Sequence, residues 1–264
     1  MTSSYPAALT MPADPKATER GIAWTLSHVK PGEDILVWVT QKQNIQDDSS
    51  VAAFTKRPGV KVETPRARFS GWAGGPVLAC WPRAEDLAQL RQRNGITALC
   101  VLGWNDKDVS WWIAHAEPDF LSPGLEVPPS PPSLDPVVLE ALLALTGSVN
   151  HANGLAGMYD HRDAVLTLNT LRAGGYSLDG ERMFEWAVGH DWPVSGAKRL
   201  RELADKIQNG VRPRVARGLD GSAAPDWLAT WRERVAEGDE LAARRLWKGE
   251  GGSAPRPDGS TPSG

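Results

Sequence analysis

The chain has 264 residues, of which 41% are hydrophobic and 23% are charged, and its formal net charge is -3 at neutral pH. This composition is typical of a globular protein, and the length suits one large domain or two smaller ones. The nearly balanced charge excludes polyanion binding through bulk charge alone, so that only a local basic patch could bind a nucleic acid.

The N-terminal segment predicts neither export nor membrane insertion. Residues 1–16 lack a basic stretch followed by an apolar core, so we expect no signal peptide, and no apolar run approaches the roughly 20 residues of a membrane span. Cys80 and Cys100 lie in apolar runs and are expected to be reduced core residues, with a bridge between adjacent strands as the alternative. We therefore expect a cytoplasmic protein without a membrane partner.

Strand and helix patterns alternate through the first half of the chain. Residues 1–16 have scattered prolines and no periodicity, and we expect them to be disordered. After them, strand patterns cover residues 35–39, 60–64, 74–82 and 96–104, and helical patterns cover residues 17–28, 51–56, 84–93 and 109–120. This order predicts an α/β domain over residues 17–125, Rossmann-like, with about four mainly parallel strands.

The standard nucleotide fingerprints are missing from this predicted domain. No G-x-G-x-x-G follows its first strand, and no G-x-x-x-x-G-K-[ST] occurs in the chain. The sequence therefore predicts no cofactor.

The second half of the chain has a different organisation. Residues 126–136 contain five prolines and predict a stiff spacer between two domains. Residues 137–248 show helical periodicity and capping signals with no strand pattern, which predicts an all-helical domain. Residues 249–264 are rich in Gly, Ser and Pro, and we expect a disordered tail.

The stretch NHANGLAGMYDHRD, residues 150–163, concentrates polar side chains of the kinds that bind metals and transfer protons. We interpret it as a joint between two helices, because Asn153 and Gly154 favour left-handed conformations and Asp160 is a good N-cap. Only His151 and His161 have no such local role, so a ligand or partner contact here requires these two side chains to converge. The ligand spacing is poor, and we predict no metal site.

A basic run lies near the end of the helical region. Residues 195–218 carry seven basic side chains against two acidic ones: Lys198, Arg199, Arg201, Lys206, Arg212, Arg214 and Arg217. Short helices of which the last is basic are typical of a helix-turn-helix DNA-binding domain. The turn over residues 189–196 is longer than usual and contains Pro193, which counts against that motif. A solvated helix face that pairs with acidic helices is the alternative.

A second candidate site lies at the carboxyl ends of the predicted strands, where open α/β sheets bind ligands. Polar residues follow three of these strands: Thr40, Gln41, Lys42 and Asn44; Arg66 and Arg68; Asn105, Asp106 and Asp108. Basic and amide side chains at this edge of the sheet, opposite the pair Asp106 and Asp108, would suit a phosphorylated or nucleotide-like ligand. The alternative is that these are polar loop ends on a fold used for packing or protein contact.

We therefore predict a non-enzymatic binding or regulatory protein. Its helical domain would contact a macromolecule, for which DNA is the candidate, through residues 195–217. The alternative function is an enzyme that acts on a nucleotide or phosphorylated small molecule at the strand ends, with Asp106 and Asp108 as metal or base candidates.

Overall fold

The computed structural model describes residues 5–67, 71–124, 133–150, 153–214 and 226–250, and their side chains up to residue 238. These residues form two compact units. The first comprises Met1–Ser133 together with Glu185–Ala197, and the second comprises Leu134–Phe184 together with Lys198–Gly264.

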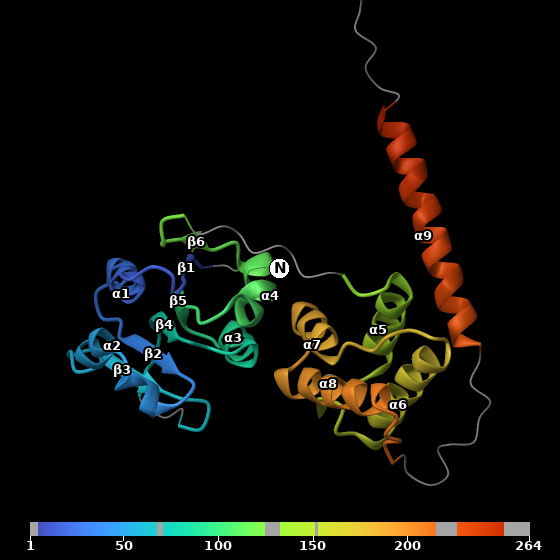
Figure 1. Cartoon of the computed structure of the whole chain (residues 1–264), viewed down its shortest axis with the longest axis horizontal. Helices are drawn as coiled ribbons and strands as arrows, with labels where there is room; N and C mark the ends of the chain where they lie inside the picture. The colour runs from blue at the N-terminus through green and yellow to red at the C-terminus, as the bar shows by residue number, and fades with distance from the viewer. Residues whose placement is uncertain (1–4, 68–70, 125–132, 151–152, 215–225, 251–264) are drawn as a thin grey trace, which may run out of the picture. The chain divides into compact units, whose positions relative to one another are not determined.

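Six strands form one sheet in the first unit, and each strand is parallel to its neighbours. The order across the sheet is β3-β2-β4-β5-β1-β6 (Figure 1). The strands are β1 (Ala7–Thr10), β2 (Ile35–Val39), β3 (Val60–Glu63), β4 (Gly75–Cys80), β5 (Ile96–Leu102) and β6 (Asp119–Phe120). The predicted Rossmann-like α/β fold is confirmed, with six strands in place of about four.

Helices cover both faces of this sheet, with α1 and α2 on one side and α3 and α4 on the other (Figure 1). The helical segments are α1 (Ala17–Ser27), the 3-10 turn η1 (Lys42–Ile45), α2 (Ser49–Phe54), α3 (Ala84–Arg91) and α4 (Asp106–Ala116). Every residue of β2 is buried, as expected of an apolar strand covered on both faces. Val51 and Phe54 of α2 pack in one core cluster with Val37 of β2.

The expectation of disorder over residues 1–16 is wrong for β1. This strand pairs with β5 from Ala7, opposite Leu99, to Thr10, opposite Leu102. Its sequence, AALT, has too few apolar residues to show a strand period, and prolines flank it in the chain. The sheet therefore extends beyond β5, and the loop that follows β1 joins the other loops at the carboxyl ends of the strands.

The predicted helix over residues 109–120 is also corrected. Helix α4 ends at Ala116, because Glu117 adopts a left-handed backbone with φ of 45°. The two residues of β6 follow, and they pair with β1 at the edge of the sheet. A left-handed residue that is not glycine is uncommon, which is why the sequence did not indicate this helix end.

The second unit is helical, as predicted. Its helices are α5 (Pro136–Ser148), α6 (Met158–Ala173), the first part of α7 (Gly180–Gly189) up to Phe184, most of α8 (Val194–Gln208) and α9 (Trp227–Glu250). Asp135 caps α5 by accepting the N–H of Val137 at 2.8 Å. Most of the predicted spacer and of the predicted tail lies outside the described residues, whereas residues 249–250 belong to α9.

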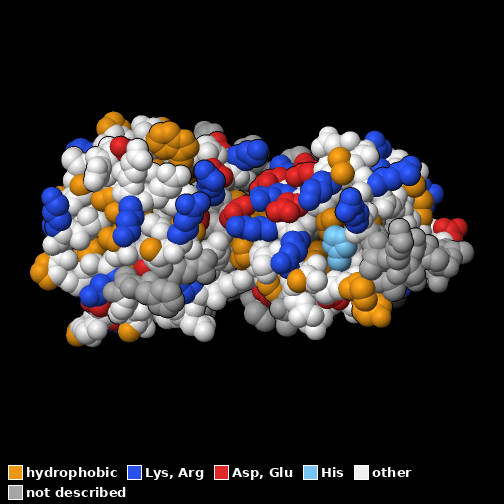
Figure 2. Space-filling model, turned by 90° about the horizontal axis from the view of Figure 1, so that it is seen from below, with side chains coloured by type: hydrophobic (Ala, Val, Ile, Leu, Met, Phe, Trp, Pro, Cys, Tyr) orange, Lys and Arg blue, Asp and Glu red, His pale blue; other side chains and the backbone are white. Residues whose placement is uncertain are grey.

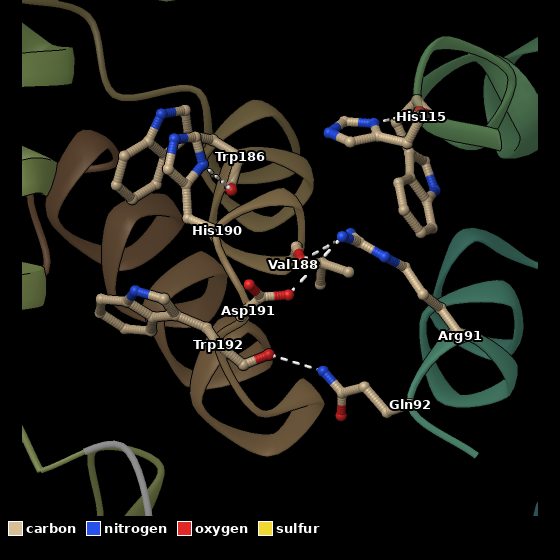
Figure 3. A network of polar contacts seen from close by, with 9 residues as sticks. Arg91, Gln92, His115, Trp186, Val188, His190, Asp191 and Trp192 are labelled. Atoms are coloured by element: carbon tan, nitrogen blue, oxygen red, sulfur yellow. Dashed lines mark hydrogen bonds and ion pairs between the residues drawn. The ribbon is translucent and has the colours of Figure 1, made fainter. Parts of the chain in front are cut away.

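Residues 185–197, which the sequence assigned to the helical domain, group with the first unit. They comprise the end of α7, a turn and the first residues of α8. Arg91 of α3 donates to the carbonyl oxygen of Val188 at 2.9 Å, and Gln92 donates to that of Trp192 at 2.7 Å (Figure 3). A Cβ atom at Gly189 would lie 2.7 Å from Nε2 of His115, so the backbone approaches α4 closely here.

Candidate functional site

The connections after neighbouring strands leave the sheet toward different faces. The chain passes from β1 and β2 to α1 and α2 on one face, and from β4 and β5 to α3 and α4 on the other (Figure 1). In the strand order this reversal falls between β2 and β4 and again between β5 and β1. Such reversals open a crevice at the carboxyl ends of the strands, where α/β proteins bind ligands.

A cavity of about 670 Å³ occupies this place, and we call it the sheet-end cavity. Its walls come from the segments that follow β1, β2, β4 and β5, and from the first residues of α1. The volume lies within the roughly 300–1,000 Å³ typical of sites for small molecules. The strand ends therefore offer a site of the right size for a metabolite.

The sheet-end cavity collects only some of the residues that the sequence indicated. Gln41, Asn44 and Asp108 line it, as does Thr40. Lys42, Arg66, Asn105 and Asp106 are not in its lining, and Arg68 lies outside the described residues. Asn105 instead caps α4, because its side chain accepts the N–H of Asp108 at 3.0 Å. The basic side chains that we expected at this site, Lys42 and Arg66, therefore do not line the cavity.

Several lining residues were not indicated by the sequence. Asp14 lies in the segment that we expected to be disordered, and Arg83 lies directly before the predicted helix over residues 84–93. Asp47 and Asp48 also line the cavity. The described lining consequently holds four aspartates and one arginine, so its charge is opposite to that expected for a phosphate site.

Thr10 carries a buried hydroxyl group in the wall of the sheet-end cavity. The residue is 0% exposed, and its Oγ1 atom has no hydrogen-bond partner among the described residues. A buried polar group left unpaired costs about 1–3 kcal/mol, and such groups are rare in folded proteins. Because the residue is 0% exposed, its hydroxyl lies behind the surface of the wall, and a molecule in the cavity would contact it only after neighbouring atoms move.

Trp81, directly after β4, has a strained backbone at the same cavity. Its φ angle is 50°, a left-handed value that costs a non-glycine residue roughly 1–2 kcal/mol. The conformation is held by a bond from its N–H to the carbonyl oxygen of Leu102 at 2.8 Å and by one from the Thr40 hydroxyl to its own carbonyl oxygen at 3.2 Å. Trp104, another lining residue, is 66% exposed. Two indole groups therefore border the cavity.

Three of the four lining aspartates already have partners. Asp14 accepts the N–H of Lys16 at 2.9 Å and pairs with Arg20 at 2.9 Å. Asp48 caps α2, and Asp108 accepts the Asn105 side-chain amide at 2.6 Å. The bond from the Lys16 N–H, with help from Ser122 and Arg20, lowers the pKa of Asp14 although desolvation opposes the shift. Asp14 is consequently a carboxylate at neutral pH.

The structure engages some side chains of the predicted basic run within the helical unit and leaves others exposed. Arg199 donates to the carbonyl oxygens of Asn153 and Gly154, at 3.2 and 2.7 Å. Arg201 lies 3.3 Å from the Glu181 carboxylate, and its guanidinium group stacks over the ring of Phe184. These two cations therefore contribute to the packing of the helical unit. Arg217 lies outside the described residues.

Three of the remaining described cations of this run are exposed. Lys206, Arg212 and Arg214 face solvent, and Lys198 is half-buried. Figure 2 shows Lys and Arg side chains mixed with Asp and Glu side chains on the face of the helical unit seen from below. Basic side chains therefore gather on this face without forming a patch of one sign.

The turn between α7 and α8 is shorter than the sequence indicated. It spans residues 190–193, because α7 ends at Gly189 and α8 begins at Val194. A helix-turn-helix domain reads bases with the first residues of its second helix. Here Val194, Gly196 and Ala197 are buried in that first turn. The turn length thus suits the motif, and the burial counts against it.

The polar joint at residues 150–163 is only partly described. His151 lies outside the described residues, and Nε2 of His161 lies 3.3 Å from the carbonyl oxygen of Arg214. The predicted N-cap is corrected: Gly157 precedes α6, and Asp160 stands in its first turn. Asp160 accepts the N–H of Asn150 at 3.1 Å and so ties the end of α5 to α6, which supports the interpretation as a joint.

Three of the histidines have a recurring structural role. Each stands four residues after a tryptophan near a helix end and donates from Nδ1 to the carbonyl oxygen of that tryptophan at 2.7–2.8 Å. The pairs are Trp24–His28, Trp111–His115 and Trp186–His190, and the last is drawn in Figure 3. These side chains help to close the ends of helices, where carbonyl groups lack partners within the helix.

Other chemistry receives little support from the described residues. Among them, no three His, Cys, Asp or Glu side chains are grouped to hold a metal ion.

Cys80 and Cys100 are free and buried, as expected of core cysteines. Burial raises the pKa of Cys100 to about 12 and that of Cys80 well above its ordinary value, so both thiols stay protonated and unreactive. No helix in the described part of the chain is long and apolar enough to cross a membrane.

Comparison with known families finds a match for the helical region. Residues 134–232 match the family described as a domain of unknown function, DUF1889. The match covers α5 to α8 and the start of α9, and it includes no strand of the sheet. No curated protein and no solved structure matches the chain.

Proposed function

We propose that this protein binds a small polar molecule in the sheet-end cavity. The observation that carries the proposal is the cavity itself, which has a volume of about 670 Å³ and is lined by the segments that follow four strands of the sheet. The Thr10 hydroxyl, which is buried behind the wall without a partner among the described residues, would gain a partner if the wall moves on ligand binding. The position of the cavity, where the connections reverse in a parallel sheet, supports the same proposal.

The conformation of Trp81 gives further support. Left-handed residues other than glycine persist where the surrounding structure holds them, and they are frequent at functional sites. Here the strained residue lies on the wall of the sheet-end cavity. The indole groups of Trp81 and Trp104 suit a planar or apolar part of a ligand, whereas Gln41 and Asn44 offer hydrogen bonds to its polar part.

The lining favours a ligand without phosphate groups. Four aspartates against one arginine would repel a phosphorylated molecule, which carries nearly two negative charges. We therefore propose ligand binding as the function, with a regulatory role in which the bound molecule is a signal. An enzyme at this site would consume its ligand, whereas a regulatory protein would release it unchanged.

Ligand binding is tested by thermal unfolding of the full chain with a panel of metabolite-sized molecules. A ligand present at 100 times its Kd stabilises the protein by about 2.7 kcal/mol, which raises Tm by several degrees. Ala17→Trp, which fills the cavity from the first residue of α1, is expected to abolish the shift. Ala23→Trp is the matched control, because Ala23 is exposed on the same helix. Equal shifts in both variants would refute the site.

Thr10→Val tests whether the wall moves on binding so that the ligand contacts the buried hydroxyl. Valine has nearly the shape of threonine but no hydroxyl group, so the expected loss is at least tenfold in affinity. The free protein should be no less stable than the wild type and up to about 1 kcal/mol more stable, because an unpaired buried group has been removed. Wild-type affinity in this variant would show that Thr10 does not contact the ligand.

A second proposal is contact between the helical unit and DNA. It is favoured by the exposed cations Lys206, Arg212 and Arg214 on α8 and the segment after it. We expect Lys206→Glu with Arg212→Glu to abolish a salt-sensitive mobility shift on duplex DNA. Lys30→Glu with Arg66→Glu, at exposed positions of the first unit, is the control. No shift by the wild type at low salt would remove this proposal.

A further inference from the structure

In the described structure, two charged side chains of the sheet-end cavity, one of each sign, have neither an ion pair nor a side-chain hydrogen bond. Asp14, Asp48 and Asp108 are held by internal donors, as given above. Asp47 and Arg83 also line the cavity, and neither forms an ion pair with another described residue. Both residues are exposed. A carboxylate and a guanidinium group are therefore available to a ligand.

The N-terminus of α1 adds a second place for a negative group. Ala17 and Thr18 belong to the first turn of this helix of 11 residues, and both line the cavity. The N-cap residue, Lys16, provides no side-chain hydrogen bond to the helix, whereas Asp48 caps α2 in that way. The N–H of Ala17 already donates to the carbonyl oxygen of Asp14 at 3.0 Å, so the N–H groups of the next two residues and the positive end of the helix dipole are what remain to attract a carboxylate.

We infer that the ligand of the sheet-end cavity is a zwitterion that carries one carboxylate and one amine, as a free amino acid does. The inference rests on the proposed function. Its carboxylate is matched by Arg83 and the start of α1, and its amine by Asp47. A singly charged amine would leave Arg83 unmatched, and a simple carboxylate would leave Asp47 unmatched. The faces of Trp81 and Trp104 suit the ligand's side chain and its cation.

Isothermal titration of the full chain with matched sets of molecules tests this inference. Each set consists of an amino acid, the amine that lacks its carboxylate and the acid that lacks its amine; phenylalanine, phenethylamine and 3-phenylpropanoic acid form one set. For at least one amino acid, we expect binding at least tenfold tighter than that of both partners in its set. An amine or acid that binds as tightly as its amino acid in every set would overturn the zwitterion.

Two variants assign the charges to residues. Arg83→Gln should weaken binding of the amino acid at least tenfold, to the affinity of its amine, and leave the amine unaffected. Asp47→Asn should weaken binding of the amino acid at least tenfold, to the affinity of its acid, and leave binding of the acid unaffected. Lys42→Gln and Asp106→Asn are the matched controls, since these exposed residues are not in the cavity lining. If the amine loses as much affinity as the amino acid in Arg83→Gln, the assigned carboxylate contact is wrong.

These outcomes separate the inference from the proposal on which it rests. If no molecule of any charge shifts the Tm of the wild type, the proposed function itself fails. If uncharged or singly charged molecules bind in a way that Ala17→Trp abolishes, the cavity is a ligand site but its ligand is not a zwitterion.

Discussion

Replacing Gly75 with alanine is expected to destabilise the first unit by about 3–5 kcal/mol. Gly75 begins β4 with φ of 136°, a value that residues with a Cβ atom rarely adopt. A Cβ atom here would overlap the carbonyl oxygen of Asp34 and would lie 3.2 Å from Cβ of Glu33. Because the obstacle is backbone next to β2, the clash can be relieved only by moving β2 away from β4, and both strands lie inside the sheet with a neighbour on each side.

Gly32→Ala separates the two causes of this loss. Gly32 also has a left-handed backbone, with φ of 85°, but nothing lies within 4 Å of the point that a Cβ atom would occupy. Its substitution should cost only about 1–2 kcal/mol from backbone strain. Urea denaturation of the full chain gives the free energy of unfolding, and hydrogen exchange of the β2 and β4 amides reports on the sheet alone. Equal losses in the two variants would mean that the contact with Asp34 is unimportant.

The sheet could be predicted where its strands are long and apolar. ILVWV indicated β2 with its observed bounds, and the apolar run around Cys100 indicated β5. β1 was missed because four residues carry no period, and the two residues of β6 follow a left-handed Glu117 that the sequence does not reveal. Local pattern thus predicted the fold class but not the edge of the sheet beyond β5.

The candidate site could be predicted only in part. Gln41, Asn44 and Asp108 follow from the rule that ligands bind at strand ends, once the strands are known. Thr10 ends β1 and Asp14 follows it, so the missed strand concealed both. That the Thr10 hydroxyl lacks a partner among the described residues and that Trp81 is left-handed are results of packing, and no residue pattern encodes them.

The number of basic residues in α8 was a poor guide to how many of them are free to bind a partner. The basic residues of this helix are where the sequence placed them, but Arg199 and Arg201 are engaged by Gly154 and Glu181. Those partners lie 45 and 20 residues away in the chain, so the local sequence does not reveal them. A basic run therefore overstates the charge that a helix presents to a partner.

Replacing Arg93 with leucine is expected to cost the first unit about 3–5 kcal/mol. Arg93 lies 2.6 Å from the carboxylate of Glu63, a side chain that is only 1% exposed. Its guanidinium group also stacks over Trp72, whose Nε1–H donates to the carbonyl oxygen of Asp34 at 2.9 Å. The substitution removes one charged partner of a buried carboxylate, and it loosens the indole that holds Asp34 beside Gly75.

Two further variants test whether the loss of stability in Arg93→Leu comes from the burial of the Glu63 charge or from the loss of an ion pair as such. Lys61→Ala breaks the pair with Asp34, at 3.8 Å and with both side chains more than one third exposed, so it should cost less than about 1 kcal/mol. Glu63→Leu added to Arg93→Leu removes the buried charge and should restore most of the lost free energy of unfolding. The full cycle over Glu63 and Arg93, measured by urea denaturation, gives the coupling energy of the pair. If Arg93→Leu costs no more than Lys61→Ala, or if the second substitution restores nothing, the buried carboxylate does not depend on Arg93.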